Sequence, residues 1–118
     1  SDANHDSLST GAKLFNDAIL LWGRVEALVF ISDELACGAL CEAQRKRISI
    51  PYETAIIGLG GLDVSSVFYP RLTTIGIPYE QLGEIAGGKL VRLLQQNEIS
   101  SETSFIPVEV KLLQRDSA

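Results

Sequence analysis

Residues 27–40 read ALVFISDELACGAL, and this stretch predicts a strand that is followed at once by a helix. The first five residues are all apolar, show no alternation and include β-branched side chains, a pattern typical of a strand buried on both faces in a parallel sheet. Ser32 and Asp33 follow as a natural N-cap, and we expect the helix over about residues 34–47.

The rest of the chain also alternates between helix and strand. Apolar residues recur three and four positions apart from Ser7 or Ser9 to near Gly23, which predicts an amphipathic helix. Further along, the patterns predict a strand over 55–59, a helical turn over 63–68, a strand over 72–75, a long helix after Pro78, and a strand over 108–112 with one solvated face. The sequence therefore predicts an α/β fold, a Rossmann-like parallel sheet with helices on its faces.

Three glycines interrupt the predicted long helix, at positions 83, 87 and 88. Each lowers helix stability by roughly 1 kcal/mol relative to alanine. We expect another backbone to approach the helix closely at these positions.

The composition is typical of a globular protein and argues against some classes of binding partner. The 118 residues suffice for one modest domain, with 46% hydrophobic and 21% charged residues. Ten Lys and Arg stand against fifteen Asp and Glu, a formal charge of −5, which argues against a nucleic-acid-binding surface on this stretch. No apolar run approaches the roughly 20 residues of a membrane span, and the first residues lack the features of a secretion signal.

The two cysteines, Cys37 and Cys41, lie one helical turn apart. That spacing places Cβ atoms about 5–6 Å apart, whereas a disulfide requires ~3.5–4.5 Å. The single histidine, His5, leaves no visible set of zinc ligands. We therefore expect reduced, buried cysteines in a cytoplasmic protein, with no metal and no cofactor.

Motifs for common enzymatic chemistry are missing. Gly58 and Gly60 begin a dinucleotide-binding pattern, but Asp63 stands where the third glycine belongs. The chain has neither a P-loop nor a nucleophile elbow. Asp33 and Glu34 could together bind Mg²⁺ after a strand, although helix capping is the simpler role for Asp33. The sequence does not predict an enzyme.

Three loops fall at the carboxyl ends of predicted strands, where open parallel sheets bind ligands. They contain Ser32 and Asp33, residues 60–62, and residues 76–79. Together they offer a hydroxyl, a carboxylate, exposed backbone and one aromatic ring. This set suits a small polar ligand held by hydrogen bonds and ring stacking.

Several ordered blocks resemble the lac repressor/gal repressor (LacI/GalR) family of transcription factors. Residues 27–40 resemble the family stretch DAVFCSNDELALGAL, and residues 50–59 resemble VPxDVSVVGFDD. Residues 69–75 are similar to PPLTTV, and Pro78 with Leu82 and Gly83 is similar to QPxxxLG. The resemblance runs from about residue 8 to residue 115.

The resemblance implies a periplasmic-binding-protein-like I fold, in which two Rossmann-like subdomains enclose an effector cleft. Residues 1–118 would form the C-terminal portion, a partial effector-binding and dimerisation domain without the helix-turn-helix headpiece. The long helix would cross to the first subdomain and the last strand would return. Operator DNA would be bound only through the missing headpiece, and the small-molecule effector would be a sugar or sugar acid.

Carried over by position, the effector contacts fall on Asp6, Ser32, Gly60 and Tyr79. Ser32 replaces the family's usual Asn, and Gly60 replaces an Asp that grips sugar hydroxyls. The loss of that carboxylate favours an anionic ligand, and residues 41–45 resemble a helix of gluconate-responsive relatives. We expect a gluconate or sugar-acid effector. Equally, the glycines at 60 and 61 could simply form a tight turn that needs positive φ.

The family's dimers pair through the helix after the first strand and the short turn after the second. By this carry-over, a homodimer interface is expected at Cys37, Cys41, Val67, Phe68 and Tyr69. The alternative, that both cysteines pack inside the monomer, stays open because helical periodicity does not distinguish the two.

Three other interpretations remain. A periplasmic sugar-binding protein would share the fold without regulating genes, and a Mg²⁺-dependent phosphotransfer domain would use Asp33 and Glu34. The chain could also fold by exchanging segments with a second copy, because the absence of a subdomain exposes apolar helix faces.

Overall fold

The computed structural model describes residues 7–96 and 105–118 and divides the chain into two units. The first unit comprises the residues up to Gly76 together with Lys111–Ala118, and the second comprises Ile77–Val110. Among the described residues, no helix combines the length and the hydropathy that crossing a membrane requires.

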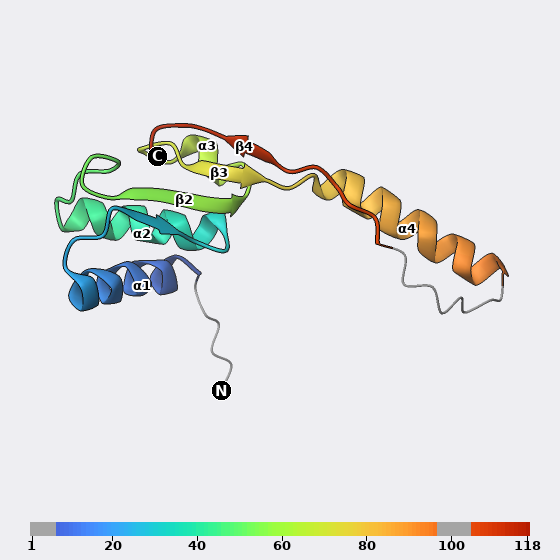
Figure 1. The fold of residues 1–118 in the computed structure, drawn as a ribbon, viewed down its shortest axis with the longest axis horizontal. Helices are drawn as coiled ribbons and strands as arrows, with labels where there is room; N and C mark the ends of the chain where they lie inside the picture. Colours follow the sequence, from blue (N-terminus) through green and yellow to red (C-terminus); the bar gives the residue numbers. More distant parts are fainter. Residues whose placement is uncertain (1–6, 97–104) are drawn as a thin grey trace. The chain divides into compact units, whose positions relative to one another are not determined.

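Helices and strands alternate along the chain, as the sequence predicts (Figure 1). The first unit contains α1 (Ser7–Trp22), β1 (Ala27–Val29), α2 (Asp33–Arg45), β2 (Ala55–Gly60), α3 (Val64–Val67), β3 (Thr73–Gly76) and β4 (Lys111–Leu113). The second unit contains α4 (Tyr79–Gln96). The predicted elements are all present, and their ends differ from the predictions by a few residues, most at β4.

One four-stranded sheet, in the order β1-β2-β3-β4, organises the first unit. β1 and β2 are parallel, as are β2 and β3, whereas β4 pairs antiparallel with β3. The predicted α/β fold with a parallel sheet is confirmed. Since β1, β2 and β3 point the same way, the segments that follow them emerge at one edge of the sheet.

The helices of this unit form two layers on one face of the sheet. α2 packs against β2, and α1 packs against α2; the ribbon shows the same order of layers (Figure 1). Fully buried side chains from all of these layers make up the core, among them Phe15, Leu40, Ile56 and Leu72. Burial of such side chains is the main favourable term in the stability of this unit.

Two glycines allow α1 and α2 to approach each other closely. A Cβ atom added to Gly11 would lie 2.0 Å from the backbone oxygen of Leu35, and one added to Gly38 would lie 2.0 Å from that of Leu8. No side chain fits into that space. The sequence patterns did not single out this pair, and the close approach was expected at the glycines of α4 instead.

The glycines of α4 have a different setting from the one predicted. A Cβ atom at Gly83, Gly87 or Gly88 would meet no atom of the described residues within 4 Å. No residue of α4 is buried, and its apolar side chains, such as Leu90 and Leu94, are exposed. Within this part of the chain, the expected close backbone approach is wrong.

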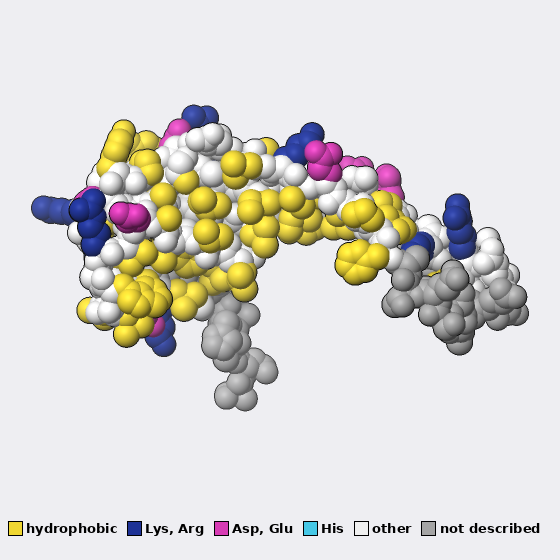
Figure 2. All heavy atoms as spheres, in the orientation of Figure 1, with side chains coloured by type: hydrophobic (Ala, Val, Ile, Leu, Met, Phe, Trp, Pro, Cys, Tyr) yellow, Lys and Arg dark blue, Asp and Glu magenta, His cyan; other side chains and the backbone are white. Residues whose placement is uncertain are grey.

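The other face of the sheet is apolar and exposed. Val29 of β1 is 68% exposed, Ile31 is 81% exposed, and Leu112 of β4 is 63% exposed. Hydrophobic side chains gather over the strands on this face (Figure 2). The expectation that the first strand is buried on both faces is wrong for the described residues, because α1 and α2 cover one face only.

We predict that Gly38→Ala destabilises the protein by about 1–3 kcal/mol, since the new methyl group overpacks the contact with the Leu8 backbone. Urea unfolding followed by circular dichroism measures the change. Gly87→Ala is the matched control. Its methyl group meets no atom within 4 Å in the part of the chain that the structure describes, and the substitution should stabilise the helix by about 1 kcal/mol. Equal stability of Gly38→Ala and the parent protein would contradict the close packing.

Candidate functional site

Ser32 lies where the chain passes from β1 into α2. It is the N-cap of α2, in an extended conformation with φ −149° and ψ 154°. Its Oγ accepts a hydrogen bond from the backbone N–H of Leu35 at 3.2 Å. The prediction that Ser32 caps this helix is therefore confirmed.

Asp33 does not cap the helix, which corrects the sequence-based interpretation. Its side chain is completely buried and turns toward the sheet, where it accepts two hydrogen bonds. The backbone N–H of Leu62 donates to Oδ2 at 2.7 Å, and the hydroxyl of Thr74 donates to Oδ1. One carboxylate thus joins the start of α2, the loop after β2, and β3.

Gly60 and Gly61 turn the chain after β2 with positive φ angles of 142° and 74°. A Cβ atom at Gly61 would lie 2.8 Å from the Cα atom of Gly76. The N–H of Gly61 donates to Oγ1 of Thr74 at 3.3 Å. The positive φ angles confirm the tight-turn interpretation of the glycine pair, and Gly60 itself is buried.

Ser32 and residues 60–62 lie at the same edge of the sheet, and we call these residues the carboxyl rim. Asp33 bridges them through its bond to Leu62. Tyr79, the first residue of α4, is 55% exposed and belongs to the second unit. Asp6 and His5 lie outside the described residues. Of the four predicted effector contacts, the structure thus brings Ser32 and Gly60 to one edge.

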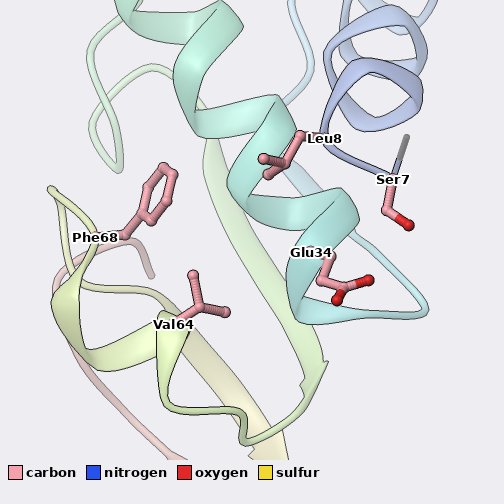
Figure 3. Close-up of a pocket in the computed structure, with 5 residues that line it drawn as sticks. All are labelled: Ser7, Leu8, Glu34, Val64 and Phe68. Carbon is pink, nitrogen blue, oxygen red and sulfur yellow. The ribbon is translucent and has the colours of Figure 1, made fainter.

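A separate hollow of about 320 Å³ lies between α1, α2 and α3. Its lining combines apolar groups with one hydroxyl and one carboxylate: Ser7, Leu8, Glu34, Val64 and Phe68 (Figure 3). Phe68 and Val64 come from or directly follow α3, and Glu34 projects from the first turn of α2. Of the predicted effector contacts that the structure describes, Ser32, Gly60 and Tyr79, none lines this hollow, but Phe68 belongs to the predicted dimer interface.

The predicted interface residues divide into buried and exposed members. Cys37 is completely buried in the core, which corrects its placement at an interface. Cys41 is exposed, as are Val67 at 78% and Tyr69 at 82%. Phe68 is half-buried and packs against the core. Both cysteines are free thiols, as their spacing predicts, but the expectation that both are buried is wrong for Cys41.

Metal-binding geometry is missing from the part of the chain that the structure describes: no three His, Cys, Asp or Glu side chains converge there. Asp33 and Glu34 also diverge. Both oxygens of Asp33 accept bonds from the protein, whereas Glu34 faces the hollow beside α1. The pair does not form the joint carboxylate site that a phosphotransfer interpretation requires.

A second buried polar cluster, which the sequence did not predict, lies at the amino ends of β2 and β3. Ser117 is completely buried; its Oγ donates to the carbonyl of Ile56 at 2.6 Å and accepts from the N–H of Thr73 at 2.8 Å. The Arg115 guanidinium donates to Oγ of Ser65 and to the carbonyl of Leu72, each at 2.8 Å. No pattern in the sequence marks Ser117 for this role.

A family model described as "Periplasmic binding protein-like domain" matches residues 3–118. The HTH-type transcriptional regulator GntR of Pseudomonas aeruginosa is 32% identical over 111 residues, which cover 94% of this chain and 32% of that protein. The lactose operon repressor of Rhizobium radiobacter is 30% identical over 101 residues, 86% of this chain and 88% of that protein.

A solved structure supports the same relationship. The transcription regulator GntR from Chromobacterium violaceum superimposes with a TM-score of 0.81 at 29% sequence identity, covering 93% of this chain and 40% of that one. The chain therefore spans about a third of the length of the Pseudomonas regulator and less than half of the solved one.

We predict that Cys37 resists thiol reagents in the folded protein. Burial, and secondly the negative charge of Asp33, raise its pKa from 9.0 to about 12. In a Cys41→Ser variant, a chromogenic disulfide reagent should react only after denaturation; a Cys37→Ala variant, which retains Cys41, is the control. Fast reaction of the folded Cys41→Ser variant would contradict the burial.

The same pKa shift predicts a pH dependence of stability. Between pH 9.0 and about 12, the folded state holds a thiol proton that the unfolded state has lost. The free energy of unfolding should therefore fall as pH rises through this window. Comparing denaturant titrations of the parent and Cys37→Ala measures the contribution, which should be absent from the variant.

Proposed function

Because the chain belongs to the periplasmic binding protein-like domain family, in the form found in LacI/GalR transcriptional regulators, we propose that it is the effector-binding and dimerisation part of a bacterial repressor. The proposal covers residues 1–118 as one partial domain without a DNA-binding headpiece. It describes a cytoplasmic binding protein and not an enzyme.

The carboxyl rim is the observation that carries this proposal. Ser32 and the Gly60–Gly61 turn lie at the carboxyl edge of neighbouring parallel strands, where α/β sheets of this class bind small ligands. The rim offers a hydroxyl and backbone polar groups, which suit the hydroxyls of a sugar. Tyr79 and Asp6 are proposed as further effector contacts on the strength of the resemblance alone.

We further propose that the effector is a sugar acid such as gluconate. Gly60 stands where the resemblance places a carboxylate in sugar-binding relatives, so one source of repulsion toward an anion is missing. The carboxylate of Asp33 is enclosed by donors from Leu62 and Thr74. Two proteins named GntR among the relatives support this subgroup.

The intact protein would bind operator DNA through a headpiece outside these residues. The formal charge of −5 on this chain suits such a division of roles, because phosphate contacts need clustered cations. The exposed apolar side chains of α4, Leu90 and Leu94 among them, would pack on the first subdomain. These statements concern the whole protein, of which the chain resembles about a third.

A homodimer interface is proposed on the exposed remainder of the predicted set. Cys41, Val67 and Tyr69 are exposed on or next to α2 and α3. The hollow between α1, α2 and α3 adjoins this surface through Phe68, and it offers apolar wall area to a partner. Cys37 has no part in this interface, since it is buried in the monomer.

A periplasmic sugar-binding protein is the second candidate, because it would use the same fold and rim. The named relatives are transcriptional regulators, which favours the repressor. A phosphotransfer enzyme is disfavoured by the divergence of Asp33 and Glu34.

We predict that the complete protein containing this chain binds gluconate more tightly than neutral hexoses. The reason is the missing carboxylate at position 60. Isothermal titration calorimetry with gluconate, glucose and galactose measures the order of affinities. Gly60→Asp is the matched variant: it should weaken gluconate relative to glucose, although the positive φ of 142° strains any side chain there. Tighter binding of a neutral hexose to the parent would refute the sugar-acid proposal.

We predict that Val67→Asp converts a dimer into monomers, because it places an unpaired charge on an apolar interface. Sedimentation velocity measures the oligomeric state. Val67 is preferable to Phe68, which also packs on the core. Tyr52→Asp is the control, since Tyr52 is 85% exposed and lies outside the predicted interface. A dimer that persists in Val67→Asp would contradict this interface and favour segment exchange.

A further inference from the structure

The proposed function assigns no role to the buried carboxylate of Asp33. Asp33 is not among the predicted effector contacts or interface residues, yet it is completely buried and each of its two oxygens accepts a hydrogen bond. We propose that Asp33 is the positioning residue of the carboxyl rim, and that it sets the separation and orientation of Ser32 and residues 60–62. This inference rests on the proposed function only in the identity of the ligand that the rim binds.

The geometry links three segments that are far apart in sequence. Asp33 is bonded through the chain to Ser32, and its two oxygens accept from Leu62 and Thr74. Thr74 in turn accepts from the N–H of Gly61 at 3.3 Å. The Thr74 hydroxyl is therefore a relay between the carboxylate and the glycine turn. Leu62 thus has a direct bond to the carboxylate and Gly61 a relayed one, while Ser32 is its neighbour in the chain.

The carboxylate packs closely against β2 on one side. A Cβ atom at Gly58 would lie 2.3 Å from Oδ1 of Asp33, so the carboxylate lies directly against the backbone of β2. Gly58 is buried, as is Thr74. A carboxylate removed from water needs all of its donors, and the donors here belong to the rim and to β3. Movement of the rim would therefore leave a buried charge without partners.

The opposite edge of the sheet contains a purely structural hydrogen-bonding link for comparison. There Ser117 joins β2 to β3 through Ile56 and Thr73, and it too is completely buried. The two strands are thus already joined at their amino ends. Asp33 makes the second link at the edge where the chain turns into the rim, which is where a link also controls the placement of binding groups.

The first arm of the test compares Asp33→Asn with Ser117→Ala in the complete protein that contains this chain, using gluconate as the probe. Asparagine offers one oxygen to two donors, so either Leu62 or Thr74 loses its acceptor. Asp33→Asn should weaken gluconate binding by about tenfold. Ser117→Ala should lower the unfolding midpoint and leave gluconate affinity unchanged. Equal losses of affinity in the two variants would overturn the proposal.

The second arm needs no ligand and separates this inference from the proposed function. Hydrogen exchange of the Gly61 and Leu62 amides is measured by NMR in the parent, Thr74→Val and Thr74→Ser. Thr74→Val keeps the shape and removes the relay hydroxyl, so both amides should exchange faster by about tenfold. Thr74→Ser restores the hydroxyl and should restore protection.

The two arms have distinct failures. A parent protein that binds no sugar acid refutes the proposed effector, and amide exchange then decides the role of Asp33 alone. Unchanged exchange at Gly61 and Leu62 in Thr74→Val overturns the positioning role even if gluconate binds well. Should Asp33→Asn fail to fold, the two variants at position 74 still test the positioning role, through amide exchange and through gluconate titration.

Discussion

A carboxylate that is entirely withdrawn from water imposes conditions on everything around it. In this protein Asp33 obtains its donors from Leu62 and Thr74, and each donor constrains its own segment. Residue 58 has to be glycine, because the carboxylate occupies the space of a side chain. Residue 74 has to bring a hydroxyl. The loop after β2 has to present a backbone N–H. The arrangement of β2, β3 and α2 at this edge follows from those conditions.

A second constraint acts between the helices and determines which face of the sheet is covered. Gly11 and Gly38 bring α1 and α2 into backbone contact, so both helices lie in layers on the same side. The opposite face keeps Val29, Ile31 and Leu112 exposed. An apolar patch of this kind marks a surface that another chain segment or a partner covers. The exposed apolar residues of α4 have the same property.

The elements and the fold class were predictable because they depend on local patterns, such as the apolar run at residues 27–31 that located β1. The same run led to an overestimate of how far β1 is buried, because composition does not show which other segments cover the two faces of a strand. Side-chain partners far apart in sequence were beyond prediction. From its neighbours in the sequence, Asp33 was interpreted as a helix cap. Its actual hydrogen-bond partners lie 29 and 41 residues away. The resemblance to LacI/GalR regulators could not separate Cys37, which is buried, from Cys41, which is exposed on the same helix.

The electrostatic character of the carboxyl rim follows from how its one buried charge is satisfied. Donors from Leu62 and Thr74 are directed at Asp33 and are not available to a ligand. The Ser32 side chain lies at the amino terminus of α2, where the helix dipole is positive. The same terminus carries Glu34, but that side chain faces the hollow beside α1. Under the proposed function, the absence of a carboxylate at position 60 and the positive end of α2 would together favour a ligand that carries a carboxylate.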